Sequence, residues 1–569
     1  MEMLIFALVL LGVLVLIMFL QYVNAKRADG LYLQLLNNNF GLRDRSSYDG
    51  NRLRGARDYH DRHQADDSLD DVTWSDLSLD EIFADADRTE SDAGCQMLYY
   101  MLRNPLSDPD EISNRRELIN FWRRESKIRN DVLIYLHHAG RLPRGSVYDL
   151  LKSCREIEPK SFTEYYVRIA LLAVSVASMF VSTGLGTVFF VAVLLSNVYA
   201  YYRDRTRILP HLRLFAYICS LMQSADDVSR LISSADNASL KQLADRMKAL
   251  LDDLHDVRRG SLAAIGSERN TNPFRAVMNV LGIFVFADQF RFWKLRDKLM
   301  SRESDVDRLI SLTGSVDALI SAAGYVESFG DALCIPKFDD NPAGEIRLKG
   351  VYHPLIENPV ANDLDAGGSI LLTGANASGK STFLRSVALA GLFAETFGYA
   401  CAAECSMPLI RIISAMSISD DVSGGDSYYM AEIKAVRRMM NVRDRDRNNG
   451  NDMLCACFID ELLNGTNTEE RIAACTQILE AMAKDGMRVF AATHDMELTG
   501  LLSDAYVNYH FEEDLSEGDV RFSYLLKAGP SQSSNAIRLL IELGFDDGIT
   551  DRAFEMIRRH KRDGVWSAS

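Results

Sequence analysis

The stretch LLTGANASGKSTFLRS, residues 371–386, decides the fold of the C-terminal part of this chain. Its residues 374–381 fit the pattern GxxxxGKS/T, with the apolar run SILLT before them and the helix-like TFLRSVALAGLFAETF after them. Such a strand, loop and helix are typical of a phosphate-binding loop, because backbone N–H groups and the helix N-terminus both attract phosphate. The flanking segments favour this interpretation over a chance glycine-rich loop.

The predicted loop assigns roles to its polar residues. Lys380 would reach the β and γ phosphates of a nucleotide, and the Ser381 hydroxyl would hold Mg²⁺. ATP and Mg²⁺ are therefore the ligands that we expect. The predicted nucleotide-binding residues are Gly374, Ala375, Asn376, Ala377, Ser378, Gly379, Lys380, Ser381 and Thr382.

Two further apolar runs end in polar residues that suit nucleotide hydrolysis. LCACFID, residues 454–460, ends in Asp460 and is followed by Glu461, and RVFAAT, residues 488–493, is followed by His494. We expect Asp460 to complete the Mg²⁺ shell and Glu461 to activate the attacking water. His494 would reach the same carboxyl edge of the sheet, where it senses the γ-phosphate or positions water. The alternative interpretation is that Asp460 and Glu461 are ordinary surface acids and that His494 has only a structural role.

The spacing of apolar residues changes along the chain. In residues 335–569 short apolar runs alternate with helical stretches, which predicts a parallel sheet with crossover helices. Residues 76–164 and 203–334 carry apolar side chains at three- and four-residue spacing, which predicts helices. Residues 26–75 are polar, with arginines among aspartates, and are predicted to form a flexible tether.

An uncharged N-terminal run predicts a membrane anchor over residues 1–25. The run from residue 3 to residue 25 is long enough to cross a bilayer as a helix, and Lys26 and Arg27 follow it directly. A cleaved signal peptide is disfavoured, because no basic residue precedes the run and bulky residues close it. The basic pair places the following chain in the cytoplasm and the N-terminus outside.

A second uncharged run, residues 169–202, predicts a membrane hairpin, which we assign to residues 165–202. One straight helix of that length would extend about 50 Å, too far for a bilayer core of about 30 Å. The sequence STGLG at residues 182–186 is typical of a turn and divides the run into two spans. Arginines at both ends place the hairpin base in the cytoplasm. The alternative is a buried helical hairpin in a soluble domain.

Composition limits the classes of protein that remain. A chain of 569 residues with a net charge of −16 can form several domains but has little excess of basic surface for nucleic acid. Its nine cysteines show no metal-ligand spacing, so we expect reduced and mostly buried thiols.

The motifs together resemble one family. TGANASGKSTFLR, DELLNGT and ATHDMEL follow the order and spacing of the ATPase domain of the MutS family. The segment at residues 419–440, SDDVSGGDSYYMAEIKAVRRMM, is similar to the family's signature segment, and Ser427 falls on the serine that reaches a partner's nucleotide. Tyr428 stands where the family usually has threonine. In YHPLIENPVAND, residues 352–363, the resemblance places Val360 near the base.

The resemblance also covers part of the upstream region. Residues 84–122 are similar to the start of the family's helical lever domain, whereas no counterpart of the mismatch-reading N-terminal domain or of its connector is present. The resemblance implies an α/β P-loop NTPase domain with an ABC/MutS-like parallel sheet at the C-terminus. An all-α lever domain that carries transmembrane helices would precede it.

We therefore expect a membrane-anchored MutS-like ATPase that forms a homodimer through its nucleotide sites and contacts membrane lipid. It would be an integral protein of a membrane such as the bacterial inner membrane, with its ATPase domain in the cytoplasm. One alternative is an ATPase of mismatch repair or recombination that binds DNA near the membrane, which the composition does not favour. The other is a scaffold that binds nucleotide without hydrolysing it.

Overall fold

The computed structural model describes residues 23–24, 26–43, 50–142, 147–157, 161–257, 282–339, 341, 344–375, 378–416, 428–450, 453–514, 521–531 and 544–563. Most of the predicted anchor at residues 1–25 lies outside this set. The chain divides into two compact units. The helical unit comprises Met1–His63, Asp85–Tyr100 and Leu118–Ser328, and the sheet unit comprises Gln64–Ala84, Met101–Glu117 and Phe329–Ser569.

The helical unit confirms the all-α character predicted upstream of residue 335. The helices assigned wholly or mainly to it are α2 (Gly50–Arg62), α5 (Asp92–Arg103), α7 (Ser126–Ala139), α8 (Val147–Glu156), α9 (Thr163–Val181), α10 (Thr183–Ser233), α11 (Ala238–Asp253), α14 (Ala287–Met300) and α15 (Glu303–Glu327). Helix α6 (Pro109–Arg124) is divided between the two units. Buried aromatic residues fill the core, where the rings of Phe215 and Phe292 stack with centroids 5.6 Å apart.

Helices α9 and α10 form an antiparallel hairpin. Ser182 between them has an extended backbone with φ −145° and ψ 108°, so the chain reverses within the predicted STGLG turn. A Cβ atom at Gly186 would lie 2.6 Å from the Ser178 carbonyl oxygen, so glycine permits the close approach of the two helices. Further along the pair, the Asn197 side chain donates to the Arg168 carbonyl oxygen.

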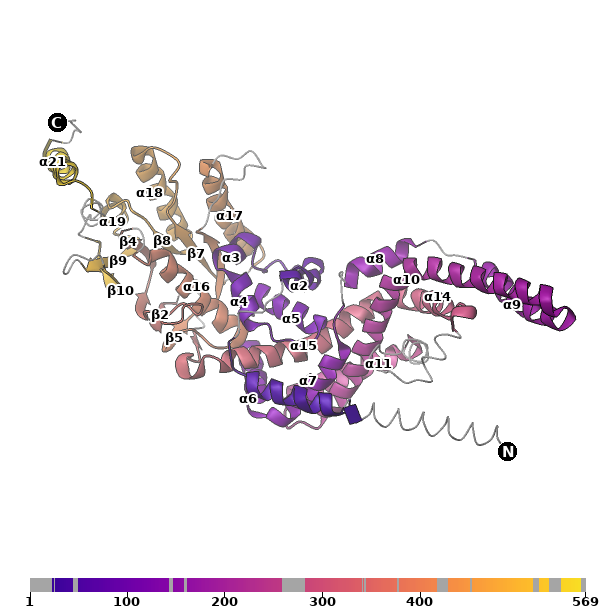
Figure 1. Cartoon of the computed structure of the whole chain (residues 1–569). Helices are drawn as coiled ribbons and strands as arrows, with labels where there is room; N and C mark the ends of the chain where they lie inside the picture. The colour runs from indigo at the N-terminus through magenta and orange to yellow at the C-terminus, as the bar shows by residue number, and fades with distance from the viewer. Residues whose placement is uncertain are drawn as a thin grey trace. The chain divides into compact units, whose positions relative to one another are not determined.

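Three helices of the described chain are long and apolar enough to cross a membrane, judged by length and composition. Of the apolar window in each helix, 11% is buried in α9 and 22% in α10, but 89% is buried in α15. Within the helical unit, α9 and the part of α10 beside it extend beyond the other helices (Figure 1). The apolar surface of α15 therefore serves the protein core, whereas that of the hairpin is left uncovered.

The sheet unit is centred on a six-stranded sheet with the order β10-β9-β4-β8-β7-β6. Its strands are β4 (Ser369–Thr373), β6 (Ile410–Ala415), β7 (Leu454–Asp460), β8 (Arg488–Ala492), β9 (Tyr506–Asp514) and β10 (Arg521–Ala528). All neighbours are parallel except β9 and β10. The carboxyl ends of β4, β7 and β8 therefore open on one edge, which places the three predicted motifs together.

Helices connect and cover these strands, as a parallel sheet requires. They are α16 (Lys380–Phe397), α17 (Tyr428–Asn448), α18 (Thr468–Lys484) and α19 (Glu497–Leu501), whereas α21 (Asp547–Asp563) follows the last strand. Every residue of β4, β6 and β8 is buried. Within the sheet the Phe458 and Phe490 rings stack with centroids 4.8 Å apart, which joins β7 to β8.

The predicted parallel sheet is confirmed for five strands, but the prediction did not include the other strands of the sheet unit. Strand β10 is antiparallel to β9, and a second, mixed sheet has the order β1-β5-β2-β3. The strands of that sheet are β1 (Lys337–Phe338), β2 (Ile346–Val351), β3 (Asn362–Ala366) and β5 (Glu404–Met407). Their polar and apolar residues alternate, so these strands lack the continuous apolar runs that identify β4, β7 and β8.

The predicted tether at residues 26–75 differs from the structure in both halves, because residues 26–39 are already helical. Besides α2, residues 26–75 include most of helix α3 (Asp71–Asp76), whose N-cap Asp70 accepts a hydrogen bond from the Thr73 N–H group at 2.8 Å. Helix α4 (Leu79–Ala86) follows it. The stretch Gln64–Ala84 belongs to the sheet unit. Besides this local cap, hydrogen bonds to distant residues order the polar segment, since Asp76 accepts from the Met416 N–H group.

Candidate functional site

The phosphate loop joins β4 to α16 and has the backbone that its glycines allow. Gly374 and Gly379 have φ values of +145° and +105°, which favour glycine. A Cβ atom at Gly374 would lie 3.0 Å from the Phe511 carbonyl oxygen and 3.1 Å from Ser378 Oγ. A side chain there would therefore fill the loop. Asn376 and Ala377, both predicted to bind nucleotide, lie outside the described residues.

Lys380 is the first residue of α16 and lies inside the loop. Its ammonium donates hydrogen bonds of 2.9 Å to the carbonyl oxygens of Gly374 and Ala375. Burial lowers the pKa of Lys380, and the carboxylates of Asp460 and Glu461 oppose that shift. A buried cation held in this way can neutralise phosphate charge, as predicted.

Ser381 and Asp460 come together where α16 begins and β7 ends. The Ser381 hydroxyl makes a hydrogen bond with the Asp460 carboxylate. Burial raises the pKa of Asp460, and the hydrogen bond from Ser381 opposes that shift. Two neighbouring oxygen ligands from different elements suit Mg²⁺, so the predicted pair is placed for this role. Thr382 follows in the first turn of α16.

Glu461 turns away from β7 with a left-handed backbone. Its φ is +57°, and its N–H group donates to the Ala492 carbonyl oxygen of β8 at 3.0 Å. One carboxylate oxygen lies 2.5 Å from His494 Nε2, and the other accepts 2.6 Å from the Asn464 amide. The hydrogen bond from His494 is the main reason that the pKa of Glu461 is lowered. A strained backbone at an ionised carboxylate is typical of a functional position.

His494 lies between the phosphate loop and Glu461 because β8 lies between β4 and β7 in the sheet. Its Nε2 atom is 3.5 Å from Lys380 Nζ and 2.5 Å from Glu461. The ammonium of Lys380 is itself a donor and already bonds two carbonyl oxygens, so the Nε2 proton is shared with Glu461. The imidazole therefore bonds the carboxylate, and the ammonium lies beside the same nitrogen.

Sequence reasoning missed two residues that hold the turn after β7. Asn464 donates to Glu461, and the N–H groups of Asn464 and Gly465 donate to the buried Glu432 carboxylate at 3.0 and 3.3 Å. Burial raises the pKa of Glu432, and these two N–H groups oppose the shift. Both residues occur in the motifs DELLNGT and SYYMAE, but only the fold shows that the motifs touch.

Tyr524 of β10 is a further residue that the sequence did not single out. A Cβ atom at Gly379 would lie 3.2 Å from Tyr524 Cδ1, so this half-exposed ring borders the phosphate loop. Asn362 links the ring's strand to the segment predicted to be near the base, because its side chain donates to the carbonyl oxygens of Tyr524 and Val360. Val360 itself is exposed.

The described residues fit a nucleotide with Mg²⁺. Ser378 Oγ is buried and has no hydrogen-bond partner among the described atoms, which is unusual unless a ligand supplies one. Around it lie backbone N–H groups, the buried ammonium of Lys380 and the oxygen pair of Ser381 and Asp460. This set provides phosphate contacts and Mg²⁺ ligands.

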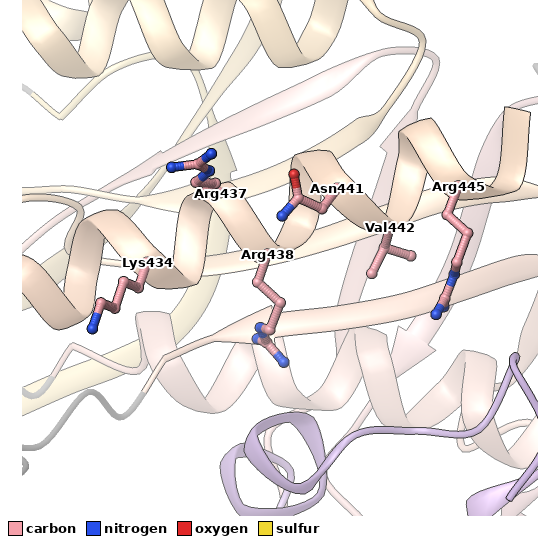
Figure 2. Close-up of a pocket in the computed structure, with 6 residues that line it drawn as sticks. All are labelled: Lys434, Arg437, Arg438, Asn441, Val442 and Arg445. Carbon is pink, nitrogen blue, oxygen red and sulfur yellow. The ribbon is translucent and has the colours of Figure 1, made fainter. Parts of the chain in front are cut away.

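A basic groove on α17 lies apart from these residues. Lys434, Arg437, Arg438, Asn441, Val442 and Arg445 line it, and Arg438 and Arg445 extend to the same side of the helix (Figure 2). Arg438 pairs with Asp70, and Arg445 donates to the Asp66 carbonyl oxygen at 2.9 Å. The groove thus borders the segment before α3, and none of its lining residues belongs to the predicted nucleotide site.

Comparison with known proteins agrees with this geometry. The family model described as MutS domain V matches residues 370–560. The DNA mismatch repair protein MutS of Thermus thermophilus is 30% identical over 223 residues, which cover 38% of this chain and 26% of that protein. MutS of Thermus aquaticus is 29% identical over 41% of this chain and 28% of its own length. The DNA mismatch repair protein MutS 2 of Haloarcula marismortui is 30% identical over 192 residues, which cover 33% of this chain and 19% of that protein.

These matches coincide with the sheet and the phosphate loop. The chain matches only about a quarter of the length of the Thermus relatives, and the match falls in its C-terminal part. Ser427 lies outside the described residues, so the structure places neither it nor its predicted contact. Residues 370–560 match the family model of MutS domain V, so this part of the chain is a P-loop ATPase domain similar to that of the MutS proteins.

Proposed function

We propose that this protein is a membrane-anchored ATPase that hydrolyses ATP between two copies of its sheet unit and couples the cycle to its helical unit. One observation carries the catalytic part of the proposal. Glu461, His494 and Lys380 form a contiguous series at the carboxyl edge of the sheet, beside the Ser381 and Asp460 pair.

The chain's own residues divide the work of hydrolysis. Lys380 would neutralise charge on the phosphates, and Ser381 and Asp460 would hold the metal. Bound Mg²⁺ would supply further charge neutralisation on the phosphate oxygens. Glu461 remains ionised because its pKa is lowered, so it can orient water and accept its proton. His494 orients Glu461 and can contact the terminal phosphate.

A dimer would complete the site. The resemblance assigns Ser427 to the partner's nucleotide, and α17 begins at the next residue, Tyr428. Closure of two copies around two nucleotides would then assemble both sites at once. Mixtures of Lys380→Ala and Ser427→Ala chains test this arrangement, because each mixed dimer contains one intact site if the serine acts in trans.

The hairpin supports the membrane part of the proposal. Phe180, Val181 and Leu185 at its tip are 90%, 89% and 78% exposed. Such a continuous apolar surface is unfavourable in water and is typical of a membrane or partner contact. Arg168 and Arg203 mark its base, which would lie on the cytoplasmic side with the sheet unit.

DNA binding is the second candidate function. The relatives are named DNA mismatch repair proteins, which favours it, but the match is confined to the ATPase part. The net charge of −16 opposes a broad contact with phosphate backbones. A nucleotide-binding scaffold is the third candidate, and the pairing of Glu461 with His494 argues against it, since a scaffold does not need a water-activating carboxylate.

The deciding experiment measures ATP turnover by the purified full chain in detergent, in vesicles, and with duplex or branched DNA. Turnover that requires Lys380 and Glu461 supports the ATPase, whereas turnover unchanged in Lys380→Ala contradicts it. Stimulation by vesicles supports membrane coupling, and stimulation by DNA alone favours the second candidate. The exposed Glu469 on α18 provides a matched control as Glu469→Gln.

A further inference from the structure

An ion pair between Arg471 and Asp495 joins the start of helix α18 to the chain that follows strand β8. The guanidinium donates two hydrogen bonds, from Nε at 2.8 Å and from Nη2 at 2.7 Å, to the two carboxylate oxygens. The two side chains are only 19% and 12% exposed. A shielded, bidentate pair fixes the spacing of the segments that carry it, unlike most single contacts on a protein surface.

Asp495 directly follows His494, and the residues on both sides of this histidine are anchored. The Thr493 N–H group donates to the Leu372 carbonyl oxygen of β4, and the Asp495 N–H group donates to the Thr493 hydroxyl, both at 3.0 Å. The imidazole bonds Glu461 through Nε2, whereas its Nδ1 atom has no hydrogen-bond partner among the described residues. Because only one ring nitrogen is held, the position of the imidazole depends on the backbone that the ion pair anchors.

Helix α18 also anchors the turn that carries Glu461. Cys475, one turn after Arg471 on this helix, is 1% exposed, and its thiol donates to the Leu462 carbonyl oxygen at 3.4 Å. The backbone of the turn is strained, because Glu461 and Leu463 have φ values of +57° and +59°. Such a backbone persists only where its surroundings hold it. One helix therefore holds both segments that make the bond between Glu461 and His494.

Arg471 also supplies positive charge near the acidic groups of the site. Its hydrogen bonds to Asp495 raise its pKa, and the charge of Glu461 adds to that shift. Its own charge opposes the rise in pKa that burial causes in Glu432. The guanidinium thus lies near three carboxylates and reduces the repulsion among them.

We propose that Arg471 and Asp495 are positioning residues that hold His494 against Glu461 by fixing α18 to the chain that follows β8. The proposal rests on the ATPase proposed above and identifies what supports its water-activating carboxylate. Among the described contacts, neither side chain bonds the phosphate loop or the pair of Ser381 and Asp460. Both residues therefore act through His494.

The decisive variant is Arg471→Lys in the full chain. Lysine keeps the positive charge but cannot form two parallel hydrogen bonds, so the charge remains while the geometry is lost. We expect kcat to fall about tenfold, because a small displacement of groups that act on the substrate is costly. KM and the affinity for a fluorescent ATP analogue should stay within about twofold, since the phosphate contacts are kept.

Asp495→Asn tests the pair from its other side. The amide keeps the shape of the carboxylate but replaces one acceptor oxygen by a donor, so one of the two hydrogen bonds is lost. The same fall in kcat with unchanged nucleotide affinity is expected. Thermal unfolding shows whether each variant folds, and Asp495→Asn alone is used if Arg471→Lys does not fold.

Glu480→Gln provides a matched control on the same helix. Glu480 pairs with Lys484 at 2.6 Å near the end of α18, and these side chains are 37% and 71% exposed. Loss of this exposed pair should leave kcat unchanged. An equal fall in kcat in Glu480→Gln would show that any disturbance of α18 lowers turnover, which would overturn the proposal.

A double-mutant cycle separates the positioning of His494 from a general effect on the fold. If the ion pair acts through His494, Arg471→Lys should have little further effect on turnover in a His494→Ala chain. Single-turnover measurements with the protein in excess of ATP can follow rates too slow for the steady state. A loss of the same size in both backgrounds, or wild-type kcat in Arg471→Lys and Asp495→Asn, would overturn the proposal.

Failure of this inference is distinguishable from failure of the proposed ATPase. Turnover that is unchanged in Lys380→Ala contradicts the ATPase itself. Turnover that requires Lys380 and Glu461 but not the pair of Arg471 and Asp495 contradicts only the positioning role.

Discussion

The Glu461 carboxylate lies 2.5 Å from His494 Nε2 at the edge of the main sheet. The two residues follow adjacent parallel strands, β7 and β8, whose register pairs Asp460 with Ala492. The same Nε2 atom that bonds the carboxylate lies 3.5 Å from the Lys380 ammonium. This arrangement keeps a base ionised next to a buried cation.

Replacement of Glu461 by glutamine should abolish most ATP turnover. The amide keeps the shape of the side chain but cannot accept a proton, so kcat should fall about 10² to 10⁴-fold while ATP affinity is retained. Steady-state turnover and equilibrium binding of a nucleotide analogue measure the two quantities. Glu469→Gln serves as the control, and wild-type turnover in Glu461→Gln would remove this residue from catalysis.

Replacement of His494 by alanine should shift the acid limb of the pH–rate profile to higher pH. The hydrogen bond from His494 lowers the pKa of Glu461, so removal of the imidazole raises it toward its usual value. Because the pKa of Glu461 is lower in the folded protein than the value of about 4.3 expected in the unfolded chain, the ionised carboxylate stabilises the fold above about pH 4.3. This stabilisation is lost as the pH falls through the folded pKa. An unchanged acid limb in His494→Ala would show that another group sets it.

The contact between Glu432 and the turn after β7 should matter for turnover more than for nucleotide affinity. Glu432→Gln exchanges one acceptor oxygen for a donor, which costs about 1.5 to 3 kcal/mol for a charge-assisted hydrogen bond. A Cβ atom at Gly465 would lie 2.9 Å from Tyr429 Cβ, so Gly465→Ala should displace the same turn. Both variants should lower kcat. Full activity in both would show that the turn does not position Glu461.

A cysteine at position 184 should report the side of the membrane on which the hairpin tip lies. A Cβ atom at Gly184 meets no atom within 4 Å, so the substitution is tolerated. The half-buried Cys219 and Cys334 are replaced by serine in the parent chain. We expect an impermeant thiol reagent to label Gly184→Cys in intact cells, and a cysteine at position 44 only after permeabilisation. Protection of position 184 in both conditions would favour a buried hairpin.

Asp317 should make the stability of the helical unit depend on pH. This buried carboxylate of α15 accepts hydrogen bonds from the Ser91 N–H and hydroxyl groups at 2.8 and 2.6 Å, yet burial raises its pKa to about 7. Because the pKa of Asp317 is higher in the folded than in the unfolded protein, its contribution to stability is largest below about pH 4 and is lost as the pH rises through 7. The slope between these limits is about 1.4 kcal/mol per pH unit.

The variant Asp317→Asn provides the comparison for that slope. Asparagine cannot ionise, so the difference in unfolding free energy between wild type and variant should fall as pH rises from 5 to 7. Chemical denaturation in detergent at several pH values measures it. A difference that is constant across this range would show that Asp317 does not titrate there.

The sequence by itself determined the elements whose signals are local. The phosphate loop is readable because its glycines adopt positive φ values and its strand and helix flank it directly. Asp460, Glu461 and His494 are readable because parallel strands end at one edge, so residues that follow apolar runs must meet there. The hairpin follows in the same way from an uncharged run with a turn at its centre.

Only the tertiary structure decided which distant residues act together. Residue by residue, α15 and the hairpin are similarly apolar, and burial alone separates a core helix from an uncovered one. The segment at residues 66–76 has the sequence of a polar tether, because hydrogen bonds such as that from the Met416 N–H group to Asp76 leave no hydrophobic period. The hydrogen bond from the Gly465 N–H group to Glu432 likewise leaves no pattern in the sequence. Polar contacts between residues far apart in the chain depend on the packing of the elements that carry them, and no local pattern records that packing.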